Sequence, residues 1–105
     1  MLGRPKTPEQ YVDLVDQAIF EIEELRLAAE YDMESMGAAT EFLSELEQDV
    51  RALRASMADG SYRFGRENLP FVKVVESQDE RILPFKQLLL KINETHIRGL
   101  DVDEG

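Results

Sequence analysis

The sequence contains no cysteine and a single histidine among its 105 residues. Disulfides, thiolate metal sites and cysteine nucleophiles are therefore excluded. A serine triad would have to use His96, which follows Thr95 near the end of an apolar helical pattern and is expected to be a surface or half-buried residue. The Gly-x-Ser-x-Gly element of hydrolases and the paired Glu-x-x-His motifs of two-metal bundles are also absent. We expect no enzyme activity, no cofactor and no metal ion.

One enzymatic alternative is a magnesium site built from carboxylates. Oxygen ligands suffice for Mg²⁺, and the first half of the chain offers several acidic side chains that could surround a cleft: Glu23, Glu30, Glu34 and Glu41. No pairs of acidic residues converge from separate apolar stripes, however. Exposed helix carboxylates are therefore the favoured interpretation.

Long apolar runs are missing as well. No window approaches the roughly 20 apolar residues of a membrane span, and residues 1–6 are not followed by the apolar core of a signal peptide. These features predict a cytoplasmic protein that does not bind membranes. The formal net charge of −10 disfavours binding to nucleic acid, which requires a basic surface, so no direct nucleic-acid binding is expected.

The negative charge is concentrated in the first half of the chain. Residues 9–58 carry 13 acidic and 3 basic side chains, whereas the rest of the chain is nearly balanced. Surplus carboxylates ordinarily form a solvated face that keeps a protein soluble. The alternative is an acidic body that docks on a basic partner surface or imitates DNA.

A long helical pattern begins at Thr7-Pro8-Glu9-Gln10, which combines an N-cap threonine, a proline at the first helical position and a glutamine three residues after the cap. Apolar residues then recur at spacings of four and three. The stripe consists of Tyr11, Val15, Ala18, Ile22, Leu25, Ala29, Met36, Ala39, Leu43, Leu46, Val50, Leu53 and Met57. It predicts a helix over residues 8–36 and a second over residues 40–58.

The pattern allows two arrangements. If Gly37 ends one helix and Thr40 caps the next, residues 8–58 form a helical hairpin with a loop from Met36 to Ala39. If the helix continues through Gly37, the same residues form one rod of roughly 75 Å that needs a partner chain in a dimeric coiled coil. The hairpin is favoured, because glycine, polar Asp32 and small residues cluster where a turn would lie.

The remaining chain predicts a loop and a C-terminal helical segment. Asp59-Gly60 ends the second helix, and residues 59–69 lack apolar periodicity. Residues 70–98 are predicted to form one C-terminal helix or two short helices, starting from Pro70, with either Ser77 or Pro84 opening the last one. Gly99 stops this helix, and residues 99–105 form an acidic tail.

The predicted fold class is therefore all-α. A hairpin and a C-terminal helix pack as a bundle of three or four helices. Residues 1–105 are expected to form a single domain that begins with an N-terminal arm over residues 1–7.

One segment is unusual in composition. Tyr62, Arg63, Phe64 and Arg66 place two aromatic rings and two guanidinium groups within five residues. These residue types dominate protein-binding hot spots and also stack on single-stranded bases. The alternative is structural: the rings close the core while the arginines pair with the acidic body. We take the four residues as a candidate protein-interaction site.

The resulting hypothesis is a non-enzymatic protein–protein interaction module, acting as an adaptor, regulator or chaperone-like protein and forming a homodimer. It rests on the long apolar stripe. With a second apolar set, the first helix has more hydrophobic surface than one antiparallel neighbour can cover; this set consists of Val12, Leu14, Ile19 and Leu27. The alternatives are an acidic decoy that occupies a basic protein surface and an enzyme with an unrecognised carboxylate site for magnesium.

Overall fold

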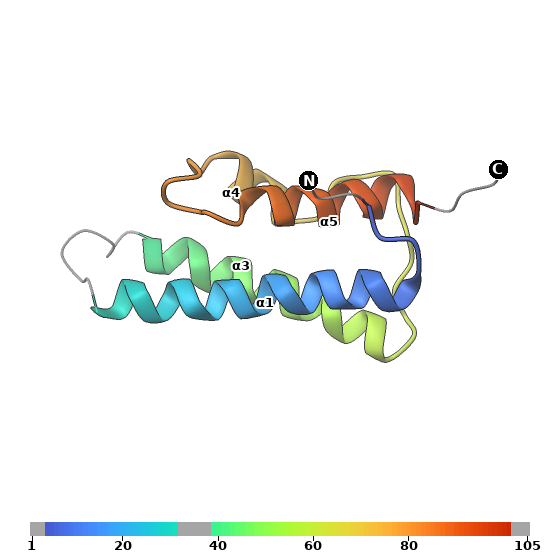
Figure 1. Ribbon diagram of the computed structural model, residues 1–105, viewed down its shortest axis with the longest axis horizontal. Helices are drawn as coiled ribbons and strands as arrows, with labels where there is room; N and C mark the ends of the chain where they lie inside the picture. Colours follow the sequence, from blue (N-terminus) through green and yellow to red (C-terminus); the bar gives the residue numbers. More distant parts are fainter. Residues whose placement is uncertain (1–3, 32–38, 102–105) are drawn as a thin grey trace.

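A computed structural model describes residues 4–31 and 39–101 of the chain. Within these residues the secondary structure is helical, with no strand (Figure 1). The helices are α1 (Pro8–Tyr31), α3 (Ala39–Ala58), α4 (Val72–Glu76) and α5 (Lys86–Arg98). The predicted all-α fold class is confirmed.

Helix α1 begins with the capping arrangement that the sequence predicts. The Thr7 hydroxyl oxygen accepts a hydrogen bond from the Gln10 backbone N–H at 3.1 Å, and the Gln10 side chain accepts one from the Lys6 N–H at 2.8 Å. These two bonds satisfy backbone donors near the helix start that have no partner within the helix. The start of α1 at Pro8 is thereby fixed by local chemistry.

Helices α1 and α3 lie side by side in opposite directions (Figure 1). The predicted stripe forms their contact: Tyr11, Val15, Ala18, Ile22, Ala29, Leu43, Leu46, Val50 and Leu53 are buried. One continuous rod over residues 8–58 cannot pack against itself, so the hairpin interpretation is correct and the rod is excluded. Helix α3 begins at Ala39, one residue before the predicted start. The predicted turn and the predicted end of the first helix at Met36 lie outside the described residues.

The C-terminal half forms two short helices. Helix α4 follows Pro70, and α5 begins after Pro84 instead of at the alternative start, Ser77. A helix from Ser77 would place Pro84 in its interior, where it removes a hydrogen bond and clashes with the preceding turn. Instead the Asp79 carbonyl oxygen accepts from the N–H groups of Ile82 and Leu83, each at 2.9 Å, which makes a turn.

The end of α5 is joined to the N-terminal arm. Gly99 has a φ of 83°, the left-handed conformation that favours glycine, and its N–H bonds to the Thr95 carbonyl at 2.7 Å. Asp101 then donates its N–H to the Pro5 carbonyl at 2.8 Å and pairs with Arg4 at 3.5 Å. Asp101, two residues after the helix stop, is thus held, while residues 102–105 of the acidic tail lie outside the described residues.

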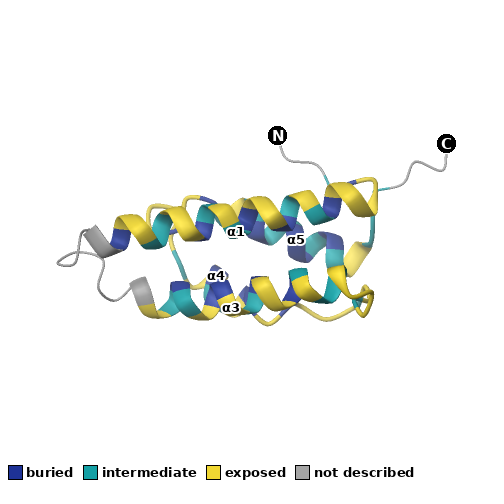
Figure 2. Cartoon of the chain, turned by 90° about the horizontal axis from the view of Figure 1, so that it is seen from below, coloured by how far each residue is buried: buried dark blue, intermediate teal, exposed yellow. Residues whose placement is uncertain are grey.

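The core lies between the α1–α3 pair and the C-terminal helices. Buried residues, coloured dark blue, occur on all four helices (Figure 2) and form one cluster. The C-terminal half contributes Leu69, Phe71, Val72, Val75, Leu83, Phe85, Leu89 and Ile92. The C-terminal helices cover one side of the α1–α3 pair. The opposite side is lined by residues of α1 and α3 alone.

Candidate functional site

The loop over residues 59–69 is held to the helices by its backbone. The Tyr62 N–H bonds to the Ser56 carbonyl at 2.9 Å, and the Gly65 N–H bonds to the His96 carbonyl at 3.2 Å. At the end of the loop, the Asn93 side-chain oxygen accepts from the Leu69 N–H at 2.8 Å. The loop is therefore fixed at three points along its length.

The aromatic residues of the loop form a cluster with α1 and α5. The ring of Phe64 stacks on Tyr11 with centroids 5.8 Å apart, and Tyr62 meets both rings edge-on. Tyr62 also packs against the ring of His96. We call Tyr11, Tyr62, Phe64 and His96 the aromatic corner; it joins the start of α1 to the end of α5.

A chain of hydrogen bonds runs through the aromatic corner. Tyr11 donates to the Ile92 carbonyl at 2.9 Å, its hydroxyl lies 3.2 Å from that of Tyr62, and the Tyr62 hydroxyl lies 2.7 Å from His96 Nδ1. The Ile92 oxygen can only accept, so Tyr11 must accept from Tyr62. His96 must then donate from Nδ1, because this assignment alone places a proton in every contact. Burial raises the pKa of Tyr11 far above its usual range, and Tyr62 adds to the shift.

His96 is enclosed on its other side by Gly65. A Cβ atom at position 65 would lie 2.9 Å from His96 Nε2, so glycine is required by close approach. Burial lowers the pKa of His96. The neutral ring therefore suits this position. His96 is half-buried, as predicted, because its ring takes part in the hydrogen bonds of the aromatic corner.

The four predicted site residues do not act as one surface. Tyr62 is half-buried and packs against the core, whereas Phe64 keeps 47% of its surface exposed. Arg63 is exposed and donates to the carbonyls of Gly60 and Tyr62. Arg66 is exposed, and neither arginine pairs with a carboxylate in the described parts of the chain. The rings thus close the core in part, and the alternative pairing of the arginines with the acidic body is not seen there.

A small apolar cavity adjoins the aromatic corner. It has a volume of about 180 Å³ and is lined by Tyr11, Tyr62, Phe64, Met57 and Val12, among others. This volume is below the range of pockets that hold drug-sized ligands. It accommodates a single side chain of a partner at most.

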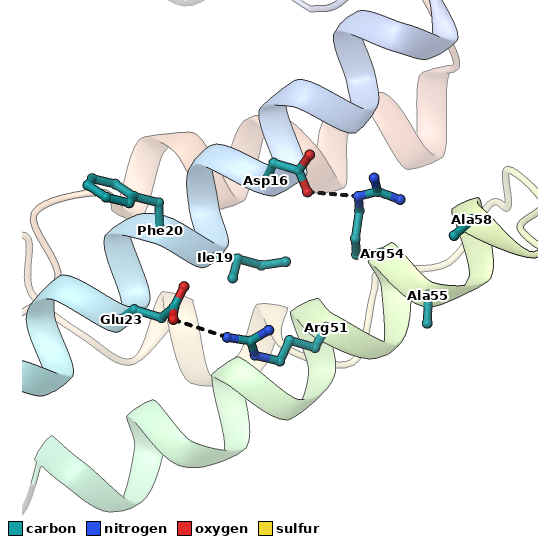
Figure 3. Close-up of a pocket in the computed structure, with 8 residues that line it drawn as sticks. All are labelled: Asp16, Ile19, Phe20, Glu23, Arg51, Arg54, Ala55 and Ala58. Atoms are coloured by element: carbon teal, nitrogen blue, oxygen red, sulfur yellow. Dashed lines mark hydrogen bonds and ion pairs between the residues drawn. The ribbon is translucent and has the colours of Figure 1, made fainter.

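A larger groove runs along the open side of the α1–α3 pair. Its main section has a volume of about 520 Å³, and a second section of about 240 Å³ shares Glu23 with it. Figure 3 shows Ile19 pointing from α1 into the main section, with Ala55 and Ala58 on the α3 side. We call the two sections together the α1–α3 groove.

Ion pairs cross the α1–α3 groove. Arg54 meets Asp16 at 2.7 Å and Arg51 meets Glu23 at 3.3 Å (Figure 3). Glu47 is 9% exposed and bonds to Arg26 and, at 2.8 Å, to Arg51. Burial raises the pKa of Glu47, but the bonds from Arg51 and Arg26 outweigh it and hold the pKa below its usual value. The three arginines are thereby engaged within the chain.

Two large apolar side chains stand exposed beside this groove. Phe20 is 54% exposed and Leu27 is 53% exposed, the highest fractions among the large hydrophobic residues described. Leu27 belongs to the second apolar set that the sequence identifies, of which Leu14 and Ile19 pack partly against the core. Phe20 was missed, because it lies outside both apolar sets. Its spacing of seven from Leu27 was the available signal.

The described residues offer no metal centre. No group of three or more histidine, aspartate or glutamate side chains among them is arranged to hold an ion. Of the carboxylates considered for magnesium, Glu23 pairs with Arg51 and Glu41 is exposed at the start of α3. Glu34 and the side chain of Glu30 lie outside the described part of the chain.

None of the described helices has both the length and the apolar character that crossing a bilayer would require. No protein-family model, curated protein or solved structure matches this chain.

Proposed function

We propose that this chain is a non-enzymatic protein–protein interaction module that binds its partner through the α1–α3 groove. The observation that carries the proposal is the pair of half-exposed anchors, Phe20 and Leu27, beside a groove that the C-terminal helices leave open. Large apolar side chains at the edge of a groove are typical binding hot spots. An adaptor, regulator or chaperone-like role is compatible with such a surface.

The test is capture of partners from a lysate of the source organism by the tagged chain and by two matched variants. Phe20→Ser removes an anchor of the groove, and Ile82→Ser removes a side chain that is 42% exposed elsewhere, in the turn before α5. We expect a stoichiometric partner with the unaltered chain and with Ile82→Ser, and its loss with Phe20→Ser. Equal capture by all three proteins would contradict the proposal.

The exposed part of the loop is a second candidate surface. Phe64 is half exposed, and Arg63 and Arg66 extend from the same loop. A double variant, Arg63→Ala with Arg66→Ala, leaves the aromatic corner intact and tests this surface alone. If that variant loses the partner while Phe20→Ser retains it, binding occurs through the loop.

The other hypotheses make different predictions. An acidic decoy would bind a partner that duplex DNA displaces and that high salt releases. A homodimer would appear in sedimentation as twice the chain mass. The apolar stripe that suggested a dimer is largely buried between α1 and α3 of one chain, so a dimer would need another surface. A magnesium enzyme would be stabilised against heat by the cation.

A further inference from the structure

The α1–α3 groove has the length of a short helix. Its two sections extend along α1 from Asp16 to Leu27 and share Glu23. The eleven steps from Asp16 to Leu27, at 1.5 Å each, give about 17 Å, or three helical turns. The length of the groove therefore limits a helical occupant to about three turns of close contact.

The shape of the groove also suits a helix. On its α3 side, Ala55 and Ala58 follow Arg51 and Arg54, and the small alanine side chains leave room there for close approach of a second backbone. Ile19 lies between the two helices (Figure 3). Phe20 and Leu27 are seven residues apart on α1, so they stand two turns apart on one face. A helix with apolar residues at i, i+3 or i+4, and i+7 would meet both.

The charges around the anchors identify the partner further. Arg26, Arg51 and Arg54 are engaged in ion pairs across the groove. Helical spacing places Asp13, just before the groove, and Glu24, between the anchors, on the same face of α1 as Phe20 and Leu27, and both are exposed. Neither makes an ion pair within the described ranges. The edge of the groove on α1 therefore carries negative charge that no other described residue neutralises.

This charge argues against a second copy as the occupant. In a symmetric dimer the same patch faces itself across the two-fold axis, so the carboxylates of one α1 would oppose those of the other. Like charges brought together at an interface disfavour association. A partner with lysine or arginine beside its apolar stripe would meet the same carboxylates favourably.

We propose that the α1–α3 groove binds one amphipathic helix of another protein, about three turns long, with an apolar stripe flanked by lysine and arginine. This inference rests on the proposed function and specifies the partner. Phe20 and Leu27 contact the stripe, and Asp13 and Glu24 contact its basic flanks. Burial of the stripe supplies most of the affinity, while the charges select the partner and make binding depend on salt.

The test uses a display library of 16-residue helical peptides in which apolar positions are fixed at i, i+4, i+7 and i+11 and all other positions are random. We expect selection on the full chain to enrich lysine and arginine beside the stripe. The most enriched peptide should bind at least 30-fold more weakly to Phe20→Ser. It should bind about tenfold more weakly at low salt to a double variant, Asp13→Asn with Glu24→Gln, and unchanged to Ile82→Ser.

Several outcomes would overturn this inference. The selection could enrich acidic or uncharged peptides, or enrich no peptide at all. The enriched peptide could bind Phe20→Ser as tightly as it binds the unaltered chain. The chain alone could form a dimer that Phe20→Ser dissociates. If a lysate partner still depends on Phe20 in these cases, the proposed function stands and the identity of the occupant is wrong. If the partner is also independent of Phe20, both fail.

Discussion

The aromatic corner and the α1–α3 groove use their residues in opposite ways. The loop that contributes Tyr62 and Phe64 to the corner has the composition of a binding site, yet Tyr62 is half-buried and both rings pack against Tyr11. The groove has an ordinary composition of alanine, acidic residues and arginine, yet Phe20 and Leu27 stand half exposed beside it. Composition therefore identifies residues able to bind, and tertiary packing determines which of them remain accessible.

The largest expected contrast is between the inner and outer faces of α1. Ile22 is fully buried and Phe20, two residues earlier, is half exposed. Ile22→Ala should lower the free energy of unfolding by about 2–5 kcal/mol, because it leaves a cavity in the core. Phe20→Ala should lower it by about 1 kcal/mol or less. Urea denaturation of the two variants measures both, and a similar loss from both would mean that Phe20 packs inside the structure.

A smaller effect is expected at Gly65 in the aromatic corner. Gly65→Ala places a methyl group against His96, which Tyr62 holds in place. We expect a loss of about 1–3 kcal/mol in the free energy of unfolding. In a His96→Ala background the same change should cost much less, since the obstructing ring is gone. Equal costs in both backgrounds would show that the close approach does not exist.

Removing one hydroxyl from the hydrogen-bond chain should have a smaller effect still. Tyr62→Phe keeps the ring contacts with Tyr11 and Phe64 but removes the hydrogen bonds to Tyr11 and His96. A net hydrogen bond contributes about 1 kcal/mol, so a loss of about 1–2 kcal/mol is expected in thermal or chemical unfolding. The variant should leave partner capture through the α1–α3 groove unchanged. A loss of capture would place the binding surface at the corner.

The smallest expected effect is a dependence of stability on pH. Because the pKa of His96 is lowered by burial, the unfolded chain takes up a proton more readily than the folded chain. The contribution of the neutral His96 to the free energy of unfolding is therefore fully present above the pKa of an unfolded histidine, about 6.5. It declines as the pH falls from about 7 towards 5. Denaturation midpoints between pH 5 and 8 measure this decline. His96→Gln should flatten it, and an unchanged decline would show that His96 is not its source.

A second decline in stability is expected at lower pH. Bonds from arginine hold the pKa of Glu47 below its usual value despite burial, and Lys91 lowers the pKa of Glu94. Their contribution is therefore present above about pH 4.5 and is lost as the pH falls below it. Glu47→Gln should reduce this second decline and leave the decline between pH 7 and 5 in place.

The sequence predicts the hairpin well because its main signals are local. The spacing of the stripe from Tyr11 to Leu53 identifies the buried faces of α1 and α3, and the Thr7 cap identifies where α1 begins. Gly99 ends α5 for an equally local reason, its left-handed conformation. The choice between hairpin and rod depends on long-range packing, which the spacing of the stripe alone does not determine.

The candidate site was harder to predict because it depends on which side of the hairpin stays uncovered. Nothing local to Phe20 indicates that α4 and α5 pack on the opposite side of α1. The half-buried position of Tyr62 likewise depends on His96 and Tyr11, which are distant from it in sequence but lie within hydrogen-bonding distance in the fold. Both features follow from contacts between elements, which a pattern within one helix does not contain.

The central claim is that the partner lies against Phe20 and not against the loop. The most direct measurement is photocrosslinking in the source organism, with p-benzoylphenylalanine introduced in turn at the positions of Phe20, Phe64 and Ile82, all of which are exposed. The account predicts a crosslinked partner from position 20 and none from positions 64 and 82. A partner crosslinked from position 64 alone, or equally from all three positions, would contradict it.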